Sequence, residues 1–124
     1  MTRFLLATDS VHTTAAACDY LDSRLTPEDF VRVVGVSEDG SRDAGDAVNV
    51  AVARLAVPEV ETVVREGDPV SELRAALESS PVDELVVGTN SPDSAVSGGL
   101  GATARSLVGH VDVPTVVLPP VDLA

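Results

Sequence analysis

A chain of 124 residues, 44% of them hydrophobic, is long enough for one domain with a single core, residues 1–124. Twenty acidic residues against eight basic ones give a net charge of −12, which argues against nucleic acid or an anionic membrane as a partner. No apolar run approaches the ~20 residues that span a bilayer, and the single Cys18 allows no internal disulfide, so we expect a cytoplasmic protein.

Short valine- and leucine-rich runs alternate with segments of helical period, which is typical of a parallel α/β sheet. Asp9 or Ser10 can cap the first helix, and Asp68-Pro69 is an N-cap followed by proline at the start of the third. In chain order we expect a strand at Phe4–Thr8, a helix at Val11–Ser23, a strand at Val31–Val36, a helix at Asp43–Ala56, a strand at Val60–Arg65, a helix from Pro69, a strand at Glu84–Gly88, a helix at Ser97–Val108 and a strand at Thr115–Leu118.

Alternation of strands and helices in so short a chain implies right-handed crossovers and an open, doubly wound sheet. Ligands of such sheets bind beyond the carboxyl ends of the strands, where the strand order reverses. We expect that crevice to be lined by Ala7–Ser10, Val36–Glu38 and Gly88–Ser91. The helical period places two sets of residues on buried faces: Ala44, Val48, Ala51, Val52 and Leu55 in the second helix, and Val70, Leu73, Ala76 and Leu77 in the third.

The acidic residues are spread along the chain, which predicts a solvated acidic surface that includes Asp22, Asp29 and Glu59. Such a surface repels itself at low salt and is screened at molar salt, where the Debye length falls to ~3 Å. We therefore expect a halophilic protein from a host with a salty cytoplasm. Cys18, in mid-helix beside Ala17, is expected to be a small buried hydrophobic residue.

The segment between the last two strands has the features of a phosphate site. Gly88 ends a strand, where the absence of a side chain lets a ligand approach the backbone, and Gly101 opens the next helix with free N–H groups. No Gly-x4-Gly-Lys-[Ser/Thr] occurs, which excludes a P-loop, and no Cys/His spacing suggests a metal site.

Three motifs together resemble the universal stress protein family over nearly the whole chain: FLLATDSVHTTAA, EGDPVSEL and the glycine segment. The family's nucleotide motif is Gly-x2-Gly-x9-Gly-[Ser/Thr], and Gly88 and Gly101 fit its spacing. Ser91 stands in place of the second glycine and Ala102 in place of the hydroxyl residue. The resemblance implies a three-layer α/β/α sandwich with a five-stranded parallel sheet of order 3-2-1-4-5, the adenine nucleotide alpha hydrolase-like fold.

The resemblance also implies a stress-response function and a regulatory adenine nucleotide, ATP, ADP or AMP. Asp9 would face the adenine or ribose, backbone at Ala7 and Val36 would frame the base, and Gly101 would offer its N–H to the phosphates. The full set of implied nucleotide-binding residues is Ala7, Thr8, Asp9, Val36, Gly88, Thr89, Ser91, Gly101, Ala102 and Thr103.

Two features of the loop argue against tight ATP binding. Pro92 biases Ser91 to extended conformations, whereas a glycine at that position could adopt a positive φ. The stretch from Gly88 to Ala104 has no Lys or Arg, and Asp93 adds a negative charge, so a triphosphate would need Mg²⁺, Mn²⁺ or high salt.

Two alternatives to a nucleotide-regulated protein remain open. The first is a nucleotide-free dimeric scaffold, because the apolar strand Thr115–Leu118 is expected at a sheet edge, where the family forms homodimers. The second is a weak nucleotide hydrolase, although the sequence offers no positioned general base and therefore no catalytic residue. His12 is expected to be an exposed turn residue and His110 to follow the fourth helix.

Overall fold

The computed structural model describes residues 2–8, 11–37, 43–55, 59–88, 107 and 111–118. The predicted strands are all present, each within one residue of its predicted ends, whereas the predicted helix Ser97–Val108 lies outside the described residues apart from Leu107. No helix in these ranges is long and apolar enough to cross a membrane. The elements are β1 (Arg3–Thr8), α1 (Val11–Asp22), β2 (Phe30–Ser37), α2 (Asp43–Arg54), β3 (Glu59–Glu66), α3 (Pro69–Ser79), β4 (Glu84–Gly88) and β5 (Thr115–Leu118).

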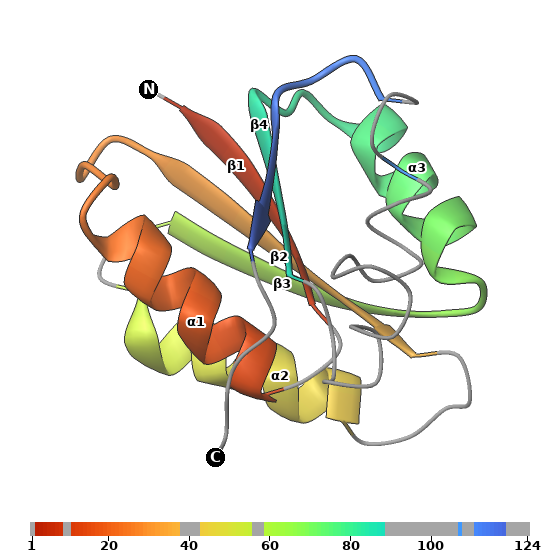
Figure 1. Ribbon diagram of the computed structural model, residues 1–124, viewed down its shortest axis with the longest axis horizontal. Helices are drawn as coiled ribbons and strands as arrows, with labels where there is room; N and C mark the ends of the chain where they lie inside the picture. Colours follow the sequence, from red (N-terminus) through yellow and green to blue (C-terminus); the bar gives the residue numbers. More distant parts are fainter. Residues whose placement is uncertain are drawn as a thin grey trace.

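The five strands form one parallel sheet in the order β3-β2-β1-β4-β5, which confirms the predicted order. Central β1 pairs with β2 on one side and with β4 on the other, so that Phe4 lies between Val31 and Glu84. Helices α1 and α2 lie together on one face of the sheet, and α3 covers the opposite face (Figure 1). The result is the predicted α/β arrangement, with helices on both faces.

The core lies on both faces because the inner strands of a parallel sheet are covered on both. On one face Leu6 and Val33 of the sheet pack with Leu21 of α1. This cluster includes Cys18, which is buried as predicted, and its burial raises the pKa of the Cys18 thiol to about 11. The cluster on the other face comprises Leu5, Ala7, Val34, Val36, Leu73, Ala76, Leu85, Val87 and Leu107.

The start of α3 is as predicted. The Asp68 carboxylate accepts a hydrogen bond of 3.0 Å from the Ser71 backbone N–H, and Pro69 occupies the first turn. Gly67 before the cap has a φ of +143°, a conformation that residues with a Cβ rarely adopt. Aspartate at the cap satisfies one of the free N–H groups of the helix, and proline has no N–H to leave unpaired.

One predicted core position of α2 is wrong. Val52 is 55% exposed, and Ala47 is fully buried in its place, together with Ala44, Val48 and Ala51. At 100° per residue, Ala47 and Val52 lie on opposite flanks of the apolar stripe, each about 70° from its centre. The period of the helix therefore could not indicate which flank the rest of the protein covers.

The expected surface position of Asp29 is also wrong. The residue is only 6% exposed, and its carboxylate accepts hydrogen bonds from the backbone N–H groups of Thr2, at 2.8 Å, and Thr26, at 2.9 Å. The bonds from Thr26 and Thr2 lower the pKa of Asp29. A carboxylate that receives two backbone N–H groups can leave the solvent, because these replace its hydration. Asp29 thus joins the start of β1 to the turn before β2.

Candidate functional site

The carboxyl ends of β1, β2 and β4 meet at one edge of the sheet, where the crevice was predicted. Thr8 is the register partner of Gly35, and Ala7 is the partner of Val87, one residue before Gly88. From β1 the chain proceeds outward through β2 and β3, and then returns to place β4 on the other side of β1. The strand order therefore reverses between β1 and β4, and ligands of doubly wound sheets bind at such a point.

The structure brings together four of the predicted site residues: Ala7, Thr8, Val36 and Gly88. Three of them, Ala7, Thr8 and Val36, are buried, with 4 to 6% of each residue exposed. Ala7 and Val36 belong to the core cluster on the α3 face. The side chains of these two residues are therefore packed in the core, which leaves their backbone groups at the strand ends.

The remaining predicted site residues lie outside the described residues: Asp9, Thr89, Ser91, Gly101, Ala102 and Thr103. His110 is outside them too, whereas His12 is exposed in the first turn of α1, as predicted. Among the described residues, no group of three or more His, Cys, Asp or Glu could hold a metal ion.

A pair of buried hydroxyl groups joins β1 to α1 behind this edge. The Oγ1 atoms of Thr8 and Thr14 lie 2.8 Å apart, and either can donate the hydrogen bond. Thr14 is fully buried. Sequence reasoning identified Thr8 from its place at a strand end but missed Thr14, because a threonine inside a helix resembles any other partly polar helical position.

Gly88 is required by the packing of α1 against β4. A Cβ at this position would lie 2.1 Å from Cγ2 of Thr13, a distance that no two unbonded carbon atoms can keep. Thr13 is buried in the first turn of α1. The sequence interpretation assigned Gly88 to the approach of a ligand. The structure adds a second reason for the glycine, which holds with or without a ligand.

The ends of β2 and β3 carry a polar corner that the sequence interpretation did not include. The Gly67 N–H donates to the Ser37 carbonyl at 2.9 Å, which holds the two strand ends together. Nη1 of Arg65 lies 3.5 Å from Oε1 of Glu72, which comes from the first turn of α3. The Arg65–Glu72 pair therefore places a cation at the same end of the sheet as the predicted site.

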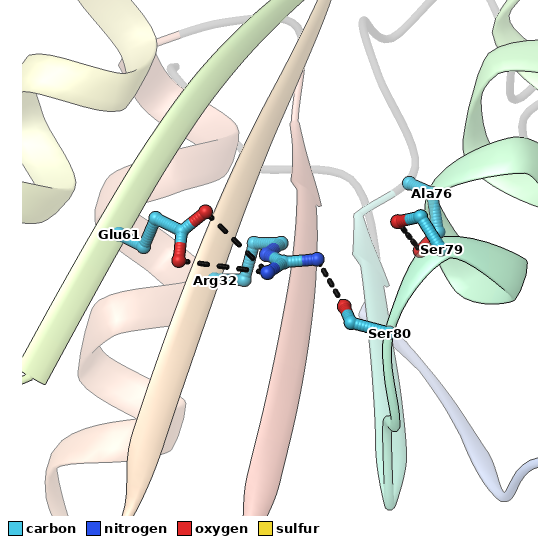
Figure 2. Close-up of polar contacts among 5 residues, drawn as sticks. All are labelled: Arg32, Glu61, Ala76, Ser79 and Ser80. Atoms are coloured by element: carbon cyan, nitrogen blue, oxygen red, sulfur yellow. Dashed lines mark hydrogen bonds and ion pairs between the residues drawn. The ribbon is translucent and has the colours of Figure 1, made fainter.

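A second arginine lies on the same face of the sheet, nearer its opposite end. Figure 2 shows Arg32 of β2 between Glu61 of β3 and Ser80 at the end of α3. Its Nη2 lies 3.4 Å from Oε1 of Glu61, and its Nη1 donates to the Ser80 hydroxyl. These contacts connect two strands and a helix, which is a structural role.

Comparison with known proteins identifies a matching family and two solved structures with a similar fold. The sequence model of the universal stress protein family matches residues 21–119. The solved structure of hypothetical protein MJ0577 superposes with a TM-score of 0.81 at 15% identity, over 99% of this chain and 98% of that one. The structure of hypothetical protein PH0823 gives a TM-score of 0.71 at 17% identity, over 99% of both chains. No curated protein matches the sequence.

Proposed function

Because this chain belongs to the universal stress protein family, we propose that it is a cytoplasmic stress-response protein regulated by an adenine nucleotide, ATP, ADP or AMP. The nucleotide binds along the carboxyl edge of the sheet, with its base toward β2 and its phosphates beyond β4. It acts as a ligand and is not turned over as a substrate.

The single observation that carries this proposal is the reversal of strand order between β1 and β4. At that point the strand ends that carry Ala7, Thr8 and Val36 lie side by side, and these residues are buried. Gly88, which has no Cβ, ends the neighbouring strand β4. Such an edge presents backbone N–H and carbonyl groups to a ligand, and these suit the polar rim of a nucleoside.

The phosphate half of the proposal rests on the glycine motif of the sequence. The sequence predicts that Gly101 opens a helix, and the backbone N–H groups of Gly101 and Ala102 would then suit an anion whatever their side chains. Mg²⁺ or Mn²⁺ bound to the phosphates would offset the repulsion from a chain of net charge −12.

The test is calorimetric titration with ATP, ADP and AMP in molar KCl with Mg²⁺ or Mn²⁺. Restoring the family motif in an S91G/A102S variant should strengthen ATP binding about tenfold, since a hydrogen bond to a charged group contributes roughly 1.5–3 kcal/mol. A matched control, A95S, adds a hydroxyl at a position for which the motif specifies no residue and should leave the affinity unchanged. Absence of binding at millimolar nucleotide in every variant would overturn the proposal, and steady phosphate release would favour the hydrolase.

The two outermost strands of the sheet, β3 and β5, differ in a way that favours a homodimer formed through β5. Such a dimer could also serve as a nucleotide-free scaffold. Edge strand β3 carries Glu59, Glu61, Arg65 and Glu66, and charged side chains discourage edge-to-edge pairing. Edge strand β5, Thr115–Leu118, has no charged residue, and all four of its residues are half-buried. An apolar edge of this kind is suited to pair with a second copy of the chain.

The register of β5 provides a selective test of this dimer. The Leu85 N–H donates to the Pro114 carbonyl, and alternate residues of a strand bond to the same neighbour. The N–H groups of Thr115 and Val117 therefore point away from β4, toward a partner strand. Val117→Pro removes one of them and should give a monomer by light scattering, whereas Val117→Thr keeps the N–H and the shape and should stay dimeric. A dimeric V117P protein would contradict pairing through β5.

A further inference from the structure

The fold brings Arg65 beside the proposed position of the base. Arg65 is the register partner of Val36, whose backbone is proposed to frame the base. Neighbouring strands lie ~4.8 Å apart, which an arginine side chain easily spans. The contact with Glu72 of α3 shows that the Arg65 side chain lies on the α3 face, where Val36 and Leu107 also pack.

The guanidinium of Arg65 is only partly paired. Its one ion pair, among the residues described, is the 3.5 Å contact with Glu72, and these two side chains are 31% and 29% exposed. Its Nε is buried, and among the same residues it has no hydrogen-bond partner. A guanidinium has five N–H donors, and a donor withdrawn from water without an acceptor is destabilising. An acceptor supplied by a ligand would remove that deficit.

Arg32 also has a buried Nε without a hydrogen-bond partner among the described residues, but it lies elsewhere in the sheet. Its register partners are Leu5 and Glu61, which lie nearer the amino ends of their strands. Both of its terminal nitrogens are engaged, one by Glu61 and the other by Ser80 (Figure 2). Arg65 is therefore the arginine of the two that can reach a ligand at the carboxyl edge.

The charges around Arg65 indicate which part of a nucleotide it can meet. Glu66 is its neighbour in β3, Asp68 caps α3, and Glu72 already pairs with it. Glu72 offsets the positive charge of the guanidinium, so a phosphate group gains little from Arg65. A ring nitrogen or carbonyl of a base is a neutral acceptor and does not depend on that charge. The corner therefore suits the base of a nucleotide and disfavours its phosphates.

We infer that the Arg65 guanidinium donates a hydrogen bond to the base of the bound nucleotide and so contributes to base recognition. Glu72 is the positioning residue, and Gly67 leaves room for it, since a Cβ there would lie 3.2 Å from Glu72 Oε2. This inference rests on the proposed function, which supplies the place of the base.

The test compares two probes, ATP and inorganic tripolyphosphate, by calorimetry on the full chain. Arg65→Met keeps the apolar stem and removes the donors, and the matched control Arg74→Met removes the same charge from an exposed site on α3. Relative to R74M, the R65M protein should bind ATP about tenfold more weakly, the effect of one hydrogen bond from a charged donor. Its affinity for tripolyphosphate should match that of R74M.

Equal ATP affinity in R65M and R74M would overturn the inference, and so would equal losses for both probes in R65M. If the wild-type protein binds ATP no better than tripolyphosphate, the proposed nucleotide function fails and the inference with it. Arg65→Lys is the second variant, because lysine keeps the charge but has no Nε fork and should show the same selective loss. Urea unfolding of each variant confirms that the compared proteins are folded.

Discussion

Replacing Gly88 with alanine tests why a glycine ends β4 at the point where the strand order reverses. The added Cβ would lie 2.1 Å from Cγ2 of Thr13 and 3.4 Å from its Cβ. Thr13 is buried in a helix, where a β-branched side chain has few rotamers, so either its rotamer or the position of α1 must change. Inserting a carbon atom into such a contact destabilises a protein by roughly 1–3 kcal/mol.

A second substitution separates this clash from other causes. Thr13→Ser removes Cγ2, the atom in conflict, and keeps the hydroxyl. By itself it should destabilise the protein by about 1 kcal/mol, the contribution of one buried methyl group. If the clash is the cause, T13S and G88A will not add. The double variant should exceed the stability expected from their sum by about 1–2 kcal/mol.

Urea unfolding followed by circular dichroism in molar KCl measures all four proteins of this cycle. Gly45→Ala is a matched control, because nothing lies within 4 Å of the added Cβ, and alanine inside α2 should stabilise the protein by ~0.5–1 kcal/mol. A loss of less than about 0.5 kcal/mol in G88A, the usual effect of a surface change, would refute the clash with Thr13. Strict additivity of T13S and G88A would equally refute it.

Three further outcomes are expected. Asp29→Asn should lower the urea midpoint at neutral pH, because its amide group opposes one of the two backbone donors. Since the pKa of Asp29 is lowered in the folded state, its contribution is complete at neutral pH and is lost on acidification, so the difference between D29N and wild type should shrink below about pH 4. Cys18, with its pKa raised to about 11, should resist a thiol reagent at mildly alkaline pH until urea unfolds the chain, and rapid labelling of the native protein would contradict its burial. The thermal midpoint should rise between low and molar KCl because of the net charge of −12, and a flat response would remove the halophilic interpretation.

The position of the four described site residues was predictable because it follows from a general rule of parallel sheets. Once the strands were placed, Thr8, Val36 and Gly88 had to lie at the same edge of the sheet, because they stand at the carboxyl ends of strands that all point the same way. The Asp68-Pro69 start of α3 was equally local, because a cap depends on neighbours in the chain.

Composition and period alone determined that this is a parallel α/β domain, where its strands begin and end, and how its third helix starts. The family resemblance then supplied the order of the strands. Only the tertiary structure decided that Thr13 fills the space beside Gly88, that Asp29 is buried, and that Arg65 stands next to Val36. Each of these depends on residues that are brought together by the sheet or by a turn of the backbone, whereas a helical or strand period reports only which face of one segment is apolar. The function of a residue such as Arg65 lies in those long-range contacts, and no local pattern records them.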